Sequence, residues 1–297
     1  MRRILTLLTL AALLALIWFW WTGGFDRLAY WAAGQQRGFQ NSMALSLRAA
    51  RAGEAGAISA LVVACFAYGF VHAAGPGHGK VLIGGYGMAR AVPMLRLSLI
   101  ALAASLGQAF TAIVLVYAGV LVLNLSREAM VGATEAVMAP ISYAAIASVG
   151  VWLMWRGLRR VQQQSQDHTH VGDENHCGAC GHVHGPTLEQ VDNIGTLREA
   201  MILITGVAVR PCTGALFVLI ITWQMGIGWL GIAGAIAMGL GTAFVTIAVG
   251  LAAGGLRGGL LAELSESPRF ALVGALVEVL VGMVVIILAL GLLLRAI

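Results

Sequence analysis

Two histidines flank an interruption in an apolar stretch of the chain, in the motif HAAGPGHGK at residues 72–80. Neutral imidazole is a good ligand for first-row metals such as nickel, cobalt, copper and zinc. On an unbroken helix, His72 and His78 would point about 240° apart. The residues before His78 that favour a helix break are Gly75, Pro76 and Gly77. A break would let both imidazoles face one ion, so the motif predicts a metal site; hydrogen bonding of both rings to nearby backbone is the alternative.

A second interruption, the motif RPCTGA, begins with Arg210 and Pro211. Its Cys212 would add a softer thiolate donor to the same metal site. An arginine near the centre of a spanning helix costs about 2.5–3.5 kcal/mol, so Arg210 is expected to have a partner. Glu278 is the acid within the predicted spans, and it is a candidate partner for Arg210, a proton carrier or a metal ligand. Lys80 is expected to extend its amine to the cytoplasmic interface.

A third group of candidate ligands lies in a hydrophilic stretch between apolar segments, at residues 168–185. This stretch contains a CxxC motif and five of the seven histidines. Its predicted metal ligands are His168, His170, His176, Cys177, Cys180, His182 and His184. These donors suit a tetrahedral zinc-like site or a looser nickel or cobalt site. A cytoplasmic location would keep the cysteines reduced, so we predict metal binding rather than a disulfide.

The elements that position these residues are predicted to be membrane-spanning helices. The chain is 59% hydrophobic and only 10% charged, which indicates a polytopic membrane protein. Seven runs are long enough to cross about 30 Å of hydrocarbon: residues 4–21, 57–75, 97–124, 138–156, 200–222, 229–253 and 270–294. The predicted fold is therefore an all-α membrane bundle of about seven transmembrane helices. The first is predicted to be an uncleaved anchor, and a removed signal peptide is the alternative.

The six later spans form two triplets that are related in sequence. LGQAFTAI at 106–113 and LGTAFVTI at 240–247 share five of eight residues, at an offset of 134. The same offset carries His78 onto Cys212. Because each triplet has three crossings, the second must be inverted, and substrate sites in such 3+3 inverted repeats form where broken helices meet. Gln108, in the first matched segment, is predicted either to line the pathway or to link helices.

The chain divides at changes in composition. The predicted regions are 1–56, an anchor helix with an outer amphipathic segment; 57–156, the first triplet; 157–199, a cytoplasmic His/Cys-rich loop; and 200–297, the second triplet. The outer segment carries Phe39, Met43 and Leu47 at helical spacing. This segment is predicted to lie on the outer face, to pack against the bundle or to dock a partner protein.

The distribution of basic residues predicts the orientation in the plasma (inner) membrane. With the N-terminus in the cytoplasm, eleven Lys and Arg residues fall inside and six outside, in agreement with the positive-inside rule. The net charge of +5 therefore reflects topology and contact with the lipid bilayer. Nucleic acid is not an expected partner, because no basic cluster is interleaved with exposed aromatic residues.

The motifs together resemble the NicO nickel/cobalt transporter family of efflux permeases. The resemblance rests on HAAGPGHGK, on RPCTGA, on the leading anchor and on the histidine-rich loop. It implies a secondary transporter that exports Ni²⁺ or Co²⁺, with Zn²⁺ a further candidate, and no tightly bound cofactor. Related uptake permeases carry acidic residues where this chain has Gly75 and Gly77, which favours the export branch.

A different class of function is a membrane thiol–disulfide electron carrier that uses Cys65 and Cys212, one in each triplet. Against it, Cys65 has the sequence context of a small core residue. An enzyme is not expected, because the chain has no HExxH motif, no serine in a glycine-flanked elbow and no paired acids in its spans. It has no P-loop either, so an ion gradient or a partner would supply the driving force.

Overall fold

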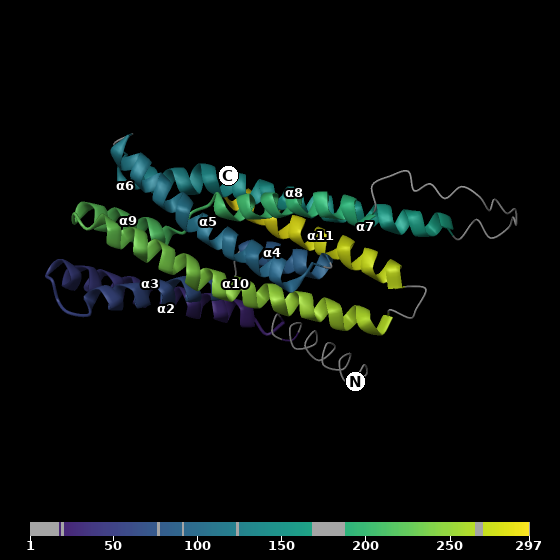
Figure 1. Ribbon diagram of the computed structural model, residues 1–297, viewed down its shortest axis with the longest axis horizontal. Coiled ribbons are helices and arrows are strands. Elements are labelled where there is room, and N and C mark those ends of the chain that lie inside the picture. Colours follow the sequence, from purple (N-terminus) through teal and green to yellow (C-terminus); the bar gives the residue numbers. More distant parts are fainter. Residues whose placement is uncertain are drawn as a thin grey trace, which may run out of the picture.

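The computed structural model describes residues 18, 21–75, 78–90, 92–122, 125–167, 188–264 and 270–296. Every regular element in these ranges is a helix, as predicted (Figure 1). The α-helices are α2 (Gly24–Arg51), α3 (Ala57–Ala74), α4 (His78–Ala89), α5 (Met94–Leu121), α6 (Arg127–Ala133), α7 (Ala139–Asp167), α8 (Leu188–Ala208), α9 (Thr213–Gln224), α10 (Gly228–Leu264) and α11 (Phe270–Ala296). A π-helix, η1 (Thr134–Met138), connects α6 to α7.

The polytopic membrane bundle is confirmed by the length and polarity of these helices. Within the described ranges, five helical segments could cross a membrane: Ala57–Ala74, Met94–Leu121, Glu128–Gln162, Gly228–Gly258 and Val273–Leu294. A sixth crossing is the bent pair Leu197–Ala208 and Thr213–Gln224, whose two parts meet at 59°. Each of the six spans predicted after the anchor coincides with one of these segments. The anchor predicted at 4–21 lies almost wholly outside the described residues.

Both predicted helix breaks are present. The first follows Ala74: Gly75 adopts an extended conformation (φ −65°, ψ 161°), and helix resumes at His78. Pro76 and Gly77 lie outside the described residues. The second break separates α8 from α9, and Cys212 is extended (φ −72°, ψ 129°) at the N-cap of α9. Proline causes such breaks because its ring disfavours helix at the preceding residue.

The helix boundaries repeat at the offset found in the sequence. Adding 134 to Ala74, the last residue of α3, gives Ala208, the last residue of α8. The same shift carries Met94, the first residue of α5, onto Gly228, the first residue of α10. Each repeat therefore consists of a broken span, a long helix and a third helix: α3/α4, α5 and α7 in the first repeat, and α8/α9, α10 and α11 in the second.

Contacts between the repeats show the predicted inversion. The first broken span runs along α10 in one direction, because a Cβ on Gly69 of α3 would meet Met238, and one on Gly84 of α4 would meet Val249. The second broken span runs along α5 in the same manner. A Cβ on Gly107 of α5 would meet Ala208 at the end of α8, and further along the ring of Trp223 in α9 lies 5.3 Å from that of Tyr117.

The long helices α5 and α10 run in opposite directions, as Figure 1 shows. Tyr117 near the end of α5 donates a hydrogen bond to the Gly228 carbonyl at the start of α10, at 3.1 Å. The start of α5 lies by the other end of α10, where Leu97 would contact a Cβ on Gly250. Since each broken span follows the long helix of the other repeat, the two broken spans cross the bundle in opposite directions. The third helices, α7 and α11, pack against each other.

Two apolar core clusters lie on either side of the breaks. One joins α3, α9 and α10 and contains Leu61, Tyr68 and Leu216, each at most 1% exposed. The other joins α4, α7 and α8 and contains Leu82 and Leu203. Packing of this kind, rather than hydrophobic burial, drives helix association in lipid. The breaks and their polar residues are therefore held between two close-packed regions.

Helix α2 packs antiparallel along α3 for the length of that helix. Its Ala32 lies beside Gly75, and its Met43 Sδ is 3.5 Å from Cys65 Sγ, nearer the start of α3. Met43 and Leu47 are buried, at 0% and 1% exposed, on the apolar stripe seen in the sequence. Packing against the bundle, one of the alternatives drawn from the sequence, is thus the arrangement observed.

Candidate functional site

A small cavity lies where the two broken spans meet. Its volume is about 50 Å³, and it is lined by His72, Ala73, Gly79, Lys80, Ser105, Gln108, Val207, Thr242 and Thr246. These residues come from α3, α4 and α5 of the first repeat and from α8 and α10 of the second. A space of about 10–15 Å³ suffices for one water molecule, so the cavity is of the size that holds an ion with a few waters.

His72 presents its imidazole to this cavity from the last turn of α3. Its Nδ1 lies 3.3 Å from Oε1 of Gln36 on α2, and its ring stacks on Tyr68, with centroids 5.9 Å apart. The carbonyl oxygen of Gln36 favours the tautomer that carries its proton on Nδ1. Nε2 then keeps a lone pair for a metal, the arrangement in which a second residue orients a histidine ligand. The sequence analysis did not identify Gln36.

Lys80 also lies in the cavity wall, which corrects the expectation that it extends to the cytoplasmic interface. Its ammonium donates a hydrogen bond to the Ala73 carbonyl. The break explains this position, because a helix that ends at Ala74 leaves its last carbonyl groups without intrahelical donors. Lys80 therefore satisfies a backbone carbonyl at the first break and adds a positive charge to the cavity.

Two side chains on the long helices donate hydrogen bonds to the backbone of the broken spans. Gln108 Nε2 on α5 donates to the Arg210 carbonyl, at 3.2 Å. Thr242 Oγ1 on α10 donates to the Gly69 carbonyl of α3, also at 3.2 Å. Both side chains also line the cavity. Of the two roles weighed from the sequence for Gln108, linking helices is the one observed.

The predicted ligands His72, His78 and Cys212 are not brought together as one described cluster. Cys212 is half-buried at the second break, where it packs against the apolar cluster around Tyr68, and it is not among the cavity-lining residues. The His78 side chain lies outside the described part of the chain. Among the residues that the structure describes, no three His, Cys, Asp or Glu side chains are placed to hold a metal ion.

The loop ligands cannot be placed relative to this cavity. His168, His170, His176, Cys177, Cys180, His182 and His184 all lie outside the described residues. The ends that the loop connects are both described: α7 ends at Asp167 and α8 begins at Leu188, at the right of Figure 1. We call this end of the bundle the linker end.

Arg210 is paired with Glu135, not with Glu278 as one reading of the sequence suggested. Its Nη2 lies 3.0 Å from Glu135 Oε2, and its guanidinium lies over the Tyr143 ring at 5.2 Å and donates to the Tyr143 hydroxyl. Glu135 lies in η1, just before the predicted span 138–156, and was therefore not considered a membrane residue. Pro211, which follows Arg210, is buried.

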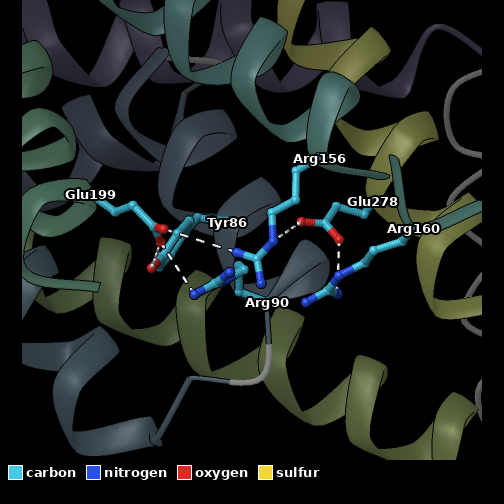
Figure 2. Close-up of polar contacts among 6 residues, drawn as sticks. All are labelled: Tyr86, Arg90, Arg156, Arg160, Glu199 and Glu278. Carbon is cyan, nitrogen blue, oxygen red and sulfur yellow. Dashed lines mark hydrogen bonds and ion pairs between the residues drawn. The ribbon is translucent and has the colours of Figure 1, made fainter. Parts of the chain in front are cut away.

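Glu278 instead belongs to a charged cluster near the linker end (Figure 2). Its carboxylate is 0% exposed and lies 3.1 Å from Arg160 Nη1 and 3.4 Å from Arg156 Nε, both on α7. Arg156 Nη1 also lies 3.9 Å from Oε1 of Glu199. A buried carboxylate requires such partners, because an isolated charge is costly in an apolar medium.

Glu199 on α8 is the second acid of this cluster. Its Oε2 accepts a hydrogen bond of 2.8 Å from the Tyr86 hydroxyl and lies 3.5 Å from Arg90 Nη2. The sequence analysis missed this cluster, because Glu199 directly precedes the predicted span 200–222. The available signal was the run of arginines at the end of α7 facing a buried acid on α11.

The chain is similar to proteins described as nickel or cobalt transporters. Residues 58–176 match the sequence profile of the NicO family, whose description is "High-affinity nickel-transport protein". The resemblance to the NicO family is confirmed. A Haemophilus influenzae protein, provisionally described as a nickel/cobalt efflux system, is 27% identical over 253 residues, which cover 80% of this chain and 77% of the relative. No solved structure gives a significant match to the chain.

The NicO match begins at the start of α3 and therefore includes His72, the first break and Lys80. The alignment with the Haemophilus influenzae protein covers 80% of the chain, so it includes parts of both repeats. The comparisons thus support metal transport by a helical membrane protein. The donor groups that line this cavity are one imidazole with hydroxyl and amide side chains, and imidazole is a ligand type that suits nickel, copper and zinc.

Proposed function

We propose that this protein is a secondary transporter that exports divalent transition-metal ions from the cytoplasm. Nickel and cobalt are the first candidates and zinc is a further one. The observation that carries the proposal is the cavity between two inverted broken spans, with His72 oriented by Gln36. Sites at discontinuous helices of inverted repeats bind substrate in many transporters.

His72 Nε2 is proposed as the first ligand of the ion in the cavity. Ser105, Thr242 and Thr246 supply hydroxyl oxygens from the two long helices. A single nitrogen with weak oxygen donors suits transport, because an ion must leave the site as readily as it enters. His78 and Cys212, at equivalent positions of the two repeats, are proposed as further ligands along the pathway.

Lys80 is proposed to occupy the cavity when no metal is bound. Its ammonium already bonds to the Ala73 carbonyl at the cavity wall. Two like charges at close range repel in an environment of low dielectric constant. A divalent ion at His72 would therefore displace this amine. After the ion departs, the amine of Lys80 would return to the cavity.

The export direction is proposed from the linker and from the relative. The His/Cys-rich loop is attached at the linker end, which the positive-inside rule places in the cytoplasm of a protein in the inner membrane. Short tracts rich in His and Cys bind metal, so a loop on the cytoplasmic side would collect ions on the side from which they are exported. The description of the Haemophilus influenzae protein as an efflux system agrees with this direction.

The thiol–disulfide carrier receives no support from the structure. Cys65 is 0% exposed, and its Sγ packs against Met43 Sδ at 3.5 Å. A thiolate must reach a disulfide sulfur for exchange to occur, and this thiol is enclosed by α2 and α3.

The proposed function is tested by metal tolerance and by cell-associated metal, measured for nickel, cobalt and zinc in cells with and without the protein. Export requires higher tolerance and lower metal content in cells that express it. The variant His72→Ala should lose this protection while its amount in the membrane stays unchanged. Full protection by His72→Ala would remove the cavity from the pathway, and a higher metal content with the protein would reverse the direction.

A further inference from the structure

Four ion pairs of the charged cluster at the linker end cross from one repeat to the other. Arg90 at the end of α4 pairs with Glu199, Arg156 pairs with both Glu199 and Glu278, and Arg160 pairs with Glu278. In these pairs the arginines belong to the first repeat and the glutamates to the second (Figure 2). The cluster therefore joins the two repeats by charge.

The ion pair on the other side of the cavity also crosses between repeats, with its signs exchanged. Here Arg210 belongs to the second repeat and Glu135, in η1, to the first. The Arg210 carbonyl accepts the hydrogen bond from the cavity residue Gln108, so one residue of this pair is bonded to the cavity wall. We call it the outer pair, and the cluster of Arg90, Arg156, Arg160, Glu199 and Glu278 the inner cluster.

Two helices connect the cavity to the inner cluster. Lys80, in the first turn of α4, lines the cavity, and Arg90 follows the last residue of the same helix. Ten residues at 1.5 Å per residue place these positions about 15 Å apart. On α8, Val207 lines the cavity and Glu199 lies two turns earlier, toward the linker end. The inner cluster therefore lies between the cavity and the linker end.

Burial makes the inner cluster sensitive to any relative movement of the repeats. Glu278 is 0% exposed, and the side chains of Arg90 and Glu199 are 8% and 12% exposed. Arg90 Nη1 is buried and has no hydrogen-bond partner in the described structure. Separation of these groups would be costly unless water entered between them, because buried ions need partners or solvent. The buried charges are therefore stabilised while they stay paired, and their separation would require water to enter between them.

We propose that the inner cluster and the outer pair are the two gates of the cavity, a reading that rests on the proposed transport function. Movement of one repeat against the other alters only the contacts that cross between them, and both sets of ion pairs do so. Opening toward the linker end separates the inner cluster while the outer pair holds, and opening toward the other end does the reverse. The outer pair takes its arginine from the second repeat, and the inner cluster takes its arginines from the first. Each gate can therefore be altered by substitutions that leave the other unchanged.

The test is the accessibility of the cavity from each side of the membrane, measured without metal. Ser105, a cavity residue that is 2% exposed, is replaced by cysteine in a chain whose four native cysteines are serines. A membrane-impermeant thiol reagent is applied to vesicles of either orientation. Glu199→Gln with Glu278→Gln should raise the labelling rate from the linker side by about tenfold, which corresponds to about 1.4 kcal/mol, and should not raise it from the opposite side.

The variant Glu135→Gln should have the opposite effect and raise labelling only from the side away from the linker. Arg159→Gln is the matched control, because Arg159 lies over the Trp155 ring of its own helix, 3.8 Å from the ring centroid. If the double variant fails to fold, Glu199→Gln alone provides the same comparison. Equal increases from both sides would indicate general loosening and would overturn the proposal, as would unchanged rates. Since no metal is transported in this assay, its result is independent of whether the protein exports metal.

Discussion

Gln108 and Thr242 occupy equivalent positions in the two repeats, and each donates a hydrogen bond of 3.2 Å to a backbone carbonyl in the broken span of the other repeat. Leu106 and Leu240, which begin the two matched segments, differ by the same 134 positions. The two bonds, which we call the clasp, thus join each long helix to the broken span of the opposite repeat, one at the break itself (Arg210) and one within α3 (Gly69). The same two side chains line the cavity, which links the stability of the breaks to the site.

Removal of one hydrogen bond of the clasp should lower the stability of the protein. Thr242→Val keeps the shape of the side chain but removes the donor, which should lower the free energy of unfolding by about 0.5–1.5 kcal/mol. The control is Thr111→Val, because Thr111 bonds only to the Gly107 carbonyl of its own helix. Thermal unfolding in detergent measures both variants. Equal melting temperatures for the two would show that the bond between repeats contributes nothing particular.

Gln36 is predicted to set the affinity of His72 for metal. Residues that orient a ligating histidine typically change metal affinity by 10–100-fold when removed, so Gln36→Leu should weaken binding by about that factor. Gln35→Leu is the control, since Gln35 is exposed on the same helix. Nickel binding by the purified protein, measured by competition with a chelating indicator, gives the comparison. An unchanged affinity in Gln36→Leu would show that Gln36 does not orient His72 for metal binding.

The contact between α3 and α10 should not tolerate a methyl group. A Cβ on Gly69 would lie 2.1 Å from the Met238 carbonyl oxygen, and one on Gly241 would lie 2.2 Å from that of Phe66. Gly69→Ala should therefore force the helices apart at a cost of about 1–3 kcal/mol. Gly38→Ala on α2 is the control, because nothing lies within 4 Å of its Cβ position. The yield of folded protein and its melting temperature report the difference.

Glu278 and Glu135 should differ sharply when each is replaced by alanine. Glu278→Ala removes a fully buried carboxylate and leaves Arg156 with Glu199 and Arg160 to solvent. Loss of one member of a buried pair costs at most about 3–5 kcal/mol. Glu135 is 50% exposed, so its loss should cost about 1 kcal/mol or less. Denaturation of the two variants in the same detergent tests this order. A larger loss for Glu135→Ala would mean that the outer pair is more deeply shielded than its exposure indicates.

The His/Cys-rich loop should bind metal without being needed for the fold. Replacement of Cys177 and Cys180 by serine should weaken zinc or nickel binding to a peptide of residues 168–185, because thiolates are the strongest donors there. The same change in the full chain should leave its melting temperature unchanged. Cobalt absorption spectra of the peptide check the first expectation. A fall in melting temperature would show instead that the loop packs against the bundle.

Several features of this protein could be predicted from the sequence because they depend on local physical chemistry. A run of apolar residues of sufficient length must cross the membrane as a helix, since backbone groups cannot stay unpaired in lipid. A proline next to glycine, or within a short polar motif, favours a helix break, so the breaks before His78 and Cys212 followed from their neighbours. The offset of 134 residues seen between 106–113 and 240–247 also relates the last residues of α3 and α8 and the first residues of α5 and α10.

Only the tertiary structure decided which polar groups meet. The partner of Arg210 depends on how far α7 is shifted along α8, and this shift brings Glu135 to it and leaves Glu278 to Arg156 and Arg160. Gln36 reaches His72 because α2 folds back along α3. Such pairings follow from close packing between helices, which is set by small differences in side-chain shape over many contacts. Hydrophobicity and helix breaks therefore determined the spans, and packing determined the clasp, the cavity and the ion pairs between the repeats.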